Sequence, residues 1–150
     1  MRVFIENEAG SRGKNTYDEF TLTFLRSEDV SRAYPFPYGF LIGTRGGDGD
    51  SVDCFVLTTT VISSGTSVMC DPIGLLEVID TGEADHKVLA VPKGEHFSVD
   101  DRVVAVLKEF INGVFAHVPG KRMQIGRLLS AEEAEAYIRD HRDASDAGSP

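Results

Sequence analysis

Short runs of alternating or continuous apolar residues occupy the first two thirds of the chain. Val3 and Ile5 alternate with Arg2, Phe4 and Glu6. In the segment 20–25, Phe20, Leu22 and Phe24 alternate with Thr21, Thr23 and Leu25. An alternation of this kind is typical of a half-buried strand. Further strands are predicted at 52–57, 67–70, 73–80 and 87–91.

Turn residues separate these runs from one another. The turn signals are Ser64-Gly65, Asp71-Pro72, Thr81-Gly82 and Pro92-Lys93-Gly94. Glycine, proline, aspartate and serine favour tight turns, so each signal is expected to end one strand before the next begins. Several short strands at such close spacing predict a small barrel or sandwich.

The last third of the chain changes to a helical period. Ser98 and Asp101 resemble a capping box, after which apolar residues recur at three- and four-residue steps as far as Val118. This pattern predicts an amphipathic helix of about five turns that ends at Pro119-Gly120. A second capping box, Ser130 with Glu133, predicts a shorter helix that runs to about Asp140.

Together these elements predict an α+β fold in which a small closed β-barrel carries two covering α-helices. The chain shows no repeat of 20–50 residues and no low-complexity linker. Residues 1–150 are therefore expected to form a single domain.

Composition and charge narrow the possible partners. Hydrophobic residues make up 41% and charged residues 26% of the 150-residue chain, as in ordinary globular proteins. The net charge of −9 argues against a nucleic-acid partner, because clustered lysine and arginine hold phosphate backbones. It does not exclude a small polyanion that metal cations bridge to the protein.

Other features of the sequence bear on its location. No apolar run approaches the length of a membrane span, and the N-terminal residues are too acidic and too short a stretch for a signal peptide. Cys54 and Cys70 lie inside apolar runs, which favours buried free thiols over a disulfide. We therefore expect a cytoplasmic protein without a membrane partner.

The stretch 47–53 reads GDGDSVD and crowds three carboxylates, Asp48, Asp50 and Asp53, at the start of a predicted strand. Two more carboxylates, Asp80 and Asp85, flank a glycine turn. Each cluster alone is consistent with a simple turn. Together, if they converge, they would provide the oxygen ligands that hard divalent cations take, which would suit metal-assisted phosphoryl chemistry.

Several motifs occur in an ordered series. Residues 34–40 read YPFPYGF and are followed by DGDSVD at 48–53; residues 85–92 read DHKVLAVP, and residues 10–14 read GSRGK. Over about residues 3–95 the series resembles the soluble, magnesium-dependent type I inorganic pyrophosphatases. In that family Y-P-x-x-Y-G-[FY] precedes D-G-D-P-x-D-V, and D-x-K-x-x-A-V-P and G-S-R-N-K occur at comparable spacing.

The resemblance implies an OB-like five-stranded barrel, Mg²⁺ as cofactor with several ions per site, and Mn²⁺ as a possible substitute. It implies pyrophosphate as substrate and a homo-oligomer, a hexamer or a trimer. Asp50 would be the general base. The remaining matched positions are Asp48, Asp53, Asp80 and Asp85 for the metals, Lys14, Arg26, Tyr38 and Lys87 for phosphate oxygens, and Glu6 and Tyr34 for the lining of the site.

This chain departs from the family pattern in its substrate-binding positions. Thr16 replaces a glutamate, and Val114 and Phe115 stand where the family has a Tyr-Lys pair after the long helix. Lys121 or Arg122 could supply replacement charge from the next loop. The departures leave three possibilities open: a pyrophosphatase, a phosphohydrolase of the same fold for another phosphoanhydride, and a weakly catalytic phosphate- or metal-binding module.

Overall fold

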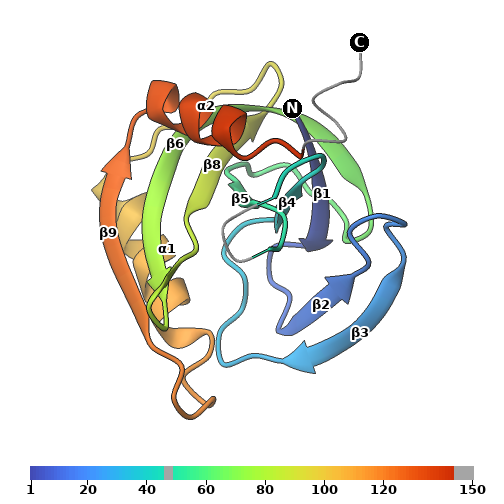
Figure 1. The fold of residues 1–150 in the computed structure, drawn as a ribbon, viewed down its shortest axis with the longest axis vertical. Coiled ribbons are helices and arrows are strands. Elements are labelled where there is room, and N and C mark those ends of the chain that lie inside the picture. The colour runs from blue at the N-terminus through green and yellow to red at the C-terminus, as the bar shows by residue number, and fades with distance from the viewer. Residues whose placement is uncertain (46–48, 144–150) are drawn as a thin grey trace.

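The computed structural model describes residues 1–45 and 49–143, and in this part of the chain five strands close into a ring (Figure 1). In spatial order they are β1 (Arg2–Asn7), β4 (Tyr38–Leu41), β5 (Asp53–Val56), β8 (Lys87–Pro92) and β6 (Ser67–Asp80). The β5–β8 pair is parallel and the others are antiparallel, and β6 closes the ring by pairing with β1. Closure removes the exposed strand edges of an open sheet. The predicted small barrel is confirmed.

Strand β6 corrects the prediction of two strands separated by a turn at Asp71-Pro72. It is one strand of 14 residues, and its pairing with β8 shifts register between Pro72 and Gly74. Proline cannot donate a ladder hydrogen bond, and an irregularity of this kind accommodates it without ending the strand. The length of β6 allows one strand to contact β1, β8 and β9.

The prediction of a strand at 20–25 is wrong. The chain forms a hairpin of β2 (Gly13–Tyr17) and β3 (Phe24–Asp29), and residues 18–23 connect them. The Asp18 carboxylate accepts hydrogen bonds from the backbone N–H groups of Phe20 and Thr21, both at 2.9 Å. This side chain therefore fixes a turn where the apolar alternation suggested a strand. Phe20 is 79% exposed.

The sequence pattern also missed β9 (Met123–Leu129) and the two-residue β7 (Glu83–Ala84). Strand β9 extends the sheet by pairing with β6 from Leu75↔Leu129 to Asp80↔Met123. Gly126 and Arg127 interrupt its apolar pattern, so alternation did not mark it. This pairing brings the loop before β9 beside the turn after β6.

Helix α1 (Asp101–Gly113) is shorter than the predicted five turns and begins at a different cap. The Asp100 side chain, in place of Ser98, accepts a hydrogen bond from the Val103 N–H at 2.9 Å. At the other end the Val114 carbonyl accepts from the Ser31 N–H at 3.0 Å, so it is already bonded outside the helix. Residues 114–117 continue as turns.

Helix α2 (Ala131–Asp140) confirms its prediction, since Ser130 accepts from the Glu133 N–H at 3.1 Å. Each helix covers one apolar cluster: α2 contributes Ala134 and Ile138 to the first, and α1 contributes Leu107 and Phe110 to the second. Strands β5 and β8 send alternate side chains into the two clusters, which explains their continuous apolar runs.

The two cysteines are buried free thiols, as predicted. Burial raises the pKa of Cys54 well above its ordinary value and that of Cys70 to about 12. Among the helices in the described part of the chain, none is long and apolar enough to cross a membrane.

Candidate active site

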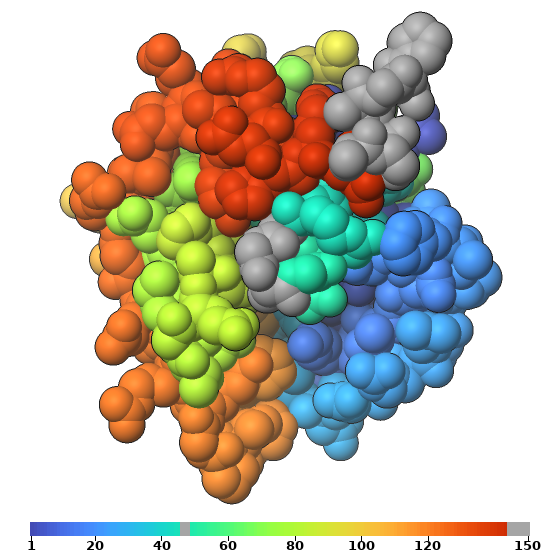
Figure 2. All heavy atoms as spheres, viewed as in Figure 1, coloured from blue at the N-terminus to red at the C-terminus, as the bar shows by residue number. Residues whose placement is uncertain are grey.

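A cavity of about 520 Å³ lies between the barrel, the β2–β3 hairpin and the end of α1. In the space-filling view the 80–85 turn and the hairpin lie on one face, and the chain after α1 lies between them at one end (Figure 2). The acidic segment 49–53 and the 80–85 turn both line this cavity, although about thirty residues separate them in the chain. The described carboxylates of these two segments that line it are Asp50, Asp53, Asp80 and Asp85.

One wall of this cavity is formed by residues on the ring strands and the turn before β8, and the ammonium group of Lys87 lies at its centre. Its Nζ atom donates to Asp53 Oδ2 at 2.7 Å, to Asp85 Oδ2 at 2.9 Å and to the Tyr38 hydroxyl at 3.0 Å. The parallel pairing of β5 with β8 sets Asp53 directly opposite Lys87. Asp85 precedes Lys87 by two residues, so local chain geometry brings the second carboxylate to the same side. All three ammonium protons thereby have partners.

Burial and neighbouring charge shift the pKa values of this cluster in different directions. Burial raises the pKa of Asp53 to about 7, against the attraction of Lys87 and with the repulsion of Asp85. For Asp85, burial is the largest single effect and raises the pKa, but the charge and hydrogen bond of Lys87, the hydrogen bond with Asp53 and the charge of Lys121 together bring it below its ordinary value. For Lys87, burial would lower the pKa, but Asp53 and Asp85 raise it. The lysine therefore stays charged between two carboxylates.

Glu6 and Tyr34 border the same cavity from β1 and from the segment before β4. Burial raises the pKa of Glu6 to about 8, and the nearby carboxylates of Asp53 and Glu19 add to the shift. Burial likewise raises the pKa of Tyr34, with a further contribution from Glu6. An additional cation in the cavity would favour the charged form of Glu6.

The Asp80 carboxylate is held from the opposite side by the loop before β9. Its Oδ2 atom lies 3.0 Å from Lys121 Nζ. Thr81 fixes that loop, because its N–H donates to the Arg122 carbonyl at 2.6 Å and its hydroxyl accepts from the Arg122 N–H at 3.2 Å. Lys121 therefore enters the cavity, whereas Arg122 is not among its lining residues.

The hairpin supplies two further basic side chains to the cavity, Lys14 and Arg26. Lys14 Nζ lies 5.0 Å from the centre of the Phe115 ring, and Lys121 Nζ lies 4.6 Å from the same ring centre. Arg26 is exposed and its Nε donates to Glu28 at 3.1 Å. The cationic groups thus come from both sides of the opening.

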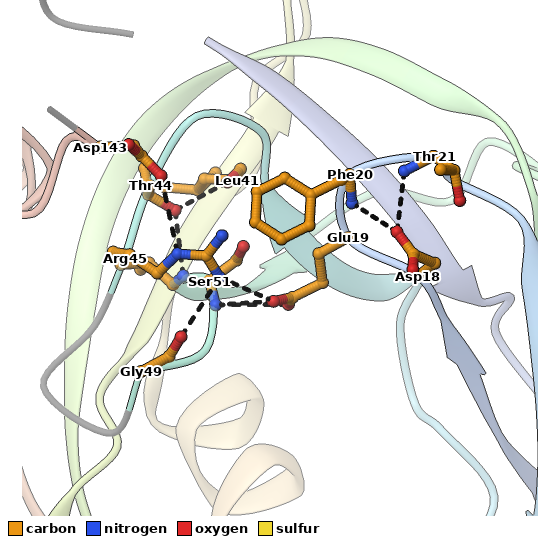
Figure 3. A network of polar contacts seen from close by, with 11 residues as sticks. Asp18, Glu19, Phe20, Thr21, Leu41, Thr44, Arg45, Gly49, Ser51 and Asp143 are labelled. Atoms are coloured by element: carbon orange, nitrogen blue, oxygen red, sulfur yellow. Dashed lines mark hydrogen bonds and ion pairs between the residues drawn. The ribbon is translucent and has the colours of Figure 1, made fainter. Parts of the chain in front are cut away.

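Arg45 stabilises the loop that carries Asp50 and leads into β5, here called the acidic loop (Figure 3). Its guanidinium donates to Glu19 Oε1 and to the Gly49 carbonyl, both at 3.2 Å, and its Nε lies 3.6 Å from Asp143 Oδ2. The Glu19 carboxylate also accepts from the Ser51 N–H at 3.2 Å. One arginine therefore links the hairpin turn, the loop that carries Asp50 and the segment after α2.

The Arg45 contacts include aromatic and backbone groups as well. The guanidinium carbon lies 4.7 Å from the centre of the Phe20 ring.

Thr44, which precedes Arg45, makes further contacts with the acidic loop. The Thr44 hydroxyl accepts from the Val52 N–H at 3.0 Å and donates to the Leu41 carbonyl at 2.7 Å. The Thr44 hydroxyl thus ties together the start and the end of the acidic loop.

The donor set of the cavity fits a hard divalent cation. Its candidate ligands are carboxylates, and no histidine or cysteine is among the described residues that line it. Hard cations such as Mg²⁺ take oxygen ligands. Within residues 1–45 and 49–143 no three such side chains are already gathered closely enough to hold an ion, since Lys87 stands between two of them. Asp48, a predicted ligand, lies outside the described residues.

Every predicted site residue that the structure describes lies on this cavity. They are Glu6, Lys14, Arg26, Tyr34, Tyr38, Asp50, Asp53, Asp80, Asp85 and Lys87. Sequence reasoning missed Glu19 and Arg45, whose only signal was charge at positions outside the predicted strands and motifs. Val114 and Phe115 line the cavity at the positions counted from Gly120, with apolar side chains in place of the family's Tyr-Lys pair.

Comparisons with known proteins agree with this geometry. The family model described as inorganic pyrophosphatase matches residues 3–145. The inorganic pyrophosphatase of Nanoarchaeum equitans is 31% identical over 94% of this chain and 94% of its own length. That of Sulfolobus acidocaldarius is 34% identical over 93% of this chain and 87% of its own length.

Solved structures repeat the fold. The inorganic pyrophosphatase of Thermus thermophilus superposes with a TM-score of 0.86 at 26% identity, over 99% of this chain and 91% of that one. That of Helicobacter pylori gives a TM-score of 0.87 at 22% identity, over 99% and 94% of the two chains, and is similar in fold. By family model, sequence and fold, this chain belongs to the inorganic pyrophosphatase family.

Proposed function

We propose that this protein hydrolyses inorganic pyrophosphate to two orthophosphates with divalent cations, and that the cation is Mg²⁺, with Mn²⁺ as a substitute. The observation that supports this most is the convergence, on one cavity, of four carboxylates from two separate segments with basic side chains from the barrel and the hairpin. Membership of the family supports the reaction itself.

Asp53, Asp80 and Asp85, together with Asp48 outside the described residues, would hold the cations. Bound there, Mg²⁺ would neutralise phosphate charge and lower the pKa of water. The raised pKa of Asp53 supports this role, because a buried carboxylate beside a second one gains from additional positive charge. An acidic protein would otherwise repel a compact polyanion.

Asp50 is proposed as the general base. The oxygen of a water molecule forms a bond to one phosphorus atom, the bond from that phosphorus to the bridging oxygen breaks, and the bridging oxygen leaves with the second phosphate. One proton of the water passes to the Asp50 carboxylate. Asp50 lines the cavity on a segment that Arg45 and Glu19 brace at Gly49 and Ser51, which supports a fixed position for the base.

Lys14, Arg26, Tyr38 and Lys87 are proposed to hold phosphate oxygens, with Glu6 and Tyr34 lining the site. Lys87 has only three donors and all are engaged, so a phosphate oxygen would have to replace one of its present partners. Its first task is therefore to keep Asp53 and Asp85 charged and oriented. Lys14 and Arg26 come from the hairpin and can approach a substrate without breaking that cluster.

Release of orthophosphate from pyrophosphate, measured with and without Mg²⁺, tests this function. Asp50→Asn should lower kcat by about 10²- to 10⁴-fold, the usual contribution of a general base. Asp71→Asn, an exposed change on β6 away from the cavity, is the matched control and should leave turnover unchanged. Full turnover by Asp50→Asn would remove Asp50 from the mechanism, and no phosphate release by the wild type would overturn the function.

A second candidate substrate is a phosphoanhydride with an organic group. The observation that favours it is the apolar wall formed by Ile111, Val114, Phe115 and Met123, which a bare pyrophosphate would not contact through its oxygens. Turnover of a nucleoside diphosphate, with no turnover of pyrophosphate, would select this candidate.

We also propose a homo-oligomer, a trimer or a hexamer, located in the cytoplasm and without a nucleic-acid partner. Exposed apolar side chains such as Val61 and Phe24 support self-association, because apolar surface gains from being covered. The net charge of −9 supports the exclusion of nucleic acid. Light scattering coupled to gel filtration would measure the number of subunits.

A further inference from the structure

We infer that Lys121 is a substrate-binding residue, which exchanges its ion pair with Asp80 for a phosphate oxygen of pyrophosphate when a cation occupies Asp80. The inference rests on the proposed function and adds a residue to it. The ammonium group lies 3.0 Å from Asp80 Oδ2 and the side chain lines the cavity.

The backbone fixes Lys121 in this position. The loop that carries it is pinned to Thr81 by two hydrogen bonds of the flanking Arg122 backbone, at 2.6 and 3.2 Å. Strand β9 begins two residues later and pairs Met123 with Asp80. The lysine therefore reaches the cavity from a paired strand end, and its approach to Asp80 follows from the register of the β6–β9 ladder.

Two ammonium groups lie close to the same aromatic ring. Lys14 Nζ and Lys121 Nζ are 5.0 and 4.6 Å from the centre of Phe115, one from the hairpin and one from the loop before β9. The ring attracts both through its π electrons, although the two like charges repel each other. A polyanion between them would relieve this repulsion. This is an arrangement suited to a ligand with several negative charges.

Among the described residues, Lys121 is also the only basic side chain that the chain after α1 contributes to the lining of the cavity. The basic side chains on the lining are Lys14 and Arg26 from the hairpin, Lys87 from β8 and Lys121. Lys87 is saturated by its three partners, and residues 114 and 115 are apolar. Without Lys121, a phosphate group beside Asp80 and Phe115 would depend on Lys14 of the hairpin alone for a positively charged partner near that ring.

The ion pair with Asp80 predicts an unusual pattern of effects. If Lys121 competes with a cation for Asp80, removing its charge strengthens Mg²⁺ binding. If the same ammonium binds a phosphate oxygen, removing it weakens pyrophosphate binding. A residue that merely supports the loop would change both affinities in the same direction or neither.

Isothermal titration with two ligands tests this: Mg²⁺ alone, and imidodiphosphate, in which NH replaces the bridging oxygen, in the presence of Mg²⁺. For Lys121→Ala we expect the imidodiphosphate affinity to fall about tenfold, the effect of losing one charge-assisted hydrogen bond in a partly exposed site. The Mg²⁺ affinity should rise. Lys121→Arg, which keeps the charge, should restore most of the imidodiphosphate affinity.

Arg122→Ala is the matched control, because it removes the same charge from the same loop but not from the cavity lining. Equal affinities in Lys121→Ala and Arg122→Ala, or a fall in both ligand affinities for Lys121→Ala, would overturn the inference while leaving the proposed function standing. A wild type that neither binds imidodiphosphate nor hydrolyses pyrophosphate would overturn the proposed function, and the inference with it.

Discussion

The two walls of the cavity are built in different ways. The strand-borne wall consists of Tyr38, Asp53, Asp85 and Lys87, of which Lys87 is only 5% exposed, and ring strands or the turn before β8 carry all four. The opposite wall comes from the β2–β3 hairpin and the chain after α1, and its polar groups are partly exposed. The first wall is therefore part of the folded core, while the second is attached to it.

This difference bears on what each wall can do. Burying a charge in the core costs free energy of folding unless the charge is paired. Substituting only one of Lys87, Asp53 and Asp85 would therefore leave an unpaired buried charge and destabilise the fold. Single substitutions on the hairpin and on the loop before β9 should have only a small effect on stability. The departures from the family pattern at Thr16, Val114 and Phe115 all lie on the second wall. The first wall is therefore suited to the chemistry that members of a family share. The second wall is suited to substrate binding and substrate selectivity.

The largest effect should come from Lys87→Met, which breaks the first wall. The change leaves Asp53 and Asp85 beside each other without their ammonium partner, and removing one member of a buried ion pair costs about 3–5 kcal/mol. The free energy of unfolding, measured in urea without Mg²⁺, should fall by this amount and phosphate release should be lost. Lys93→Met, at an exposed position, is the control. Unchanged stability of Lys87→Met would mean that the cluster is not a structural unit.

The next effect concerns Arg45, which holds the acidic loop against the second wall. Arg45→Ala should raise the Mg²⁺ concentration for half-maximal phosphate release about tenfold, the lower end of what losing a partner of a metal-site loop costs. Glu19→Gln should act in the same direction, because Glu19 contacts both Arg45 and the Ser51 N–H.

The double variant separates coupling from independent effects. If the two side chains act as one clamp, the variant with both changes should resemble Arg45→Ala alone, because the shared contact is lost only once. Strict additivity of the two changes in the Mg²⁺ half-saturation would contradict the clamp. Thermal unfolding of all three variants checks that the fold is retained.

The sequence predicted correctly those parts of the structure whose signals are local, and it missed those that depend on distant contacts. The barrel and α2 were predictable because their signals are local: the apolar runs of β5 and β8 and the Ser130–Glu133 cap each depend on neighbouring residues. The roles suggested for Asp50 and Asp85 came from a family resemblance, and the structure adds that these residues share a cavity. That sharing depends on the parallel register of β5 with β8, which no local pattern contains.

The errors have local physical causes. The alternation at 20–25 predicted a strand because a periodic pattern does not reveal that Asp18 binds two backbone N–H groups and forces a turn. The long helix was predicted to continue beyond Gly113 because the apolar period continues. That period does not reveal that the Val114 carbonyl accepts a hydrogen bond from Ser31, which is distant in sequence. Arg45 could not be found, since its partners are drawn from three separate segments.

A smaller effect is expected from Phe115→Lys, which makes the second wall more basic. The added charge should lower KM for pyrophosphate about three- to tenfold through one further charge-assisted contact. Loss of the ring should reduce turnover of a phosphoanhydride with an organic group, so the ratio of the two kcat/KM values should rise. Phe115→Leu keeps the wall apolar and should leave that ratio near the wild-type value. An unchanged ratio in Phe115→Lys would show that this wall does not select substrate.

The smallest effect should arise from Arg127→Ala on β9, the strand that follows the second wall. Arg127 donates to Glu77 on β6 from its side chain and its backbone N–H, and these bonds hold the pKa of Glu77 below its ordinary value of 4.5. A lowered carboxylate pKa means stability that is present above the ordinary value and lost as the pH falls through the folded value. The Arg127 side chain is exposed and Glu77 is partly exposed, so solvent screens the pair and the difference between wild type and variant should be small. In urea unfolding it should be present at about pH 7 and should be smaller at about pH 3, because protonation of Glu77 as the pH falls removes the charge that Arg127 binds. A difference of the same size at both pH values would show that Arg127 stabilises β9 by packing rather than by charge.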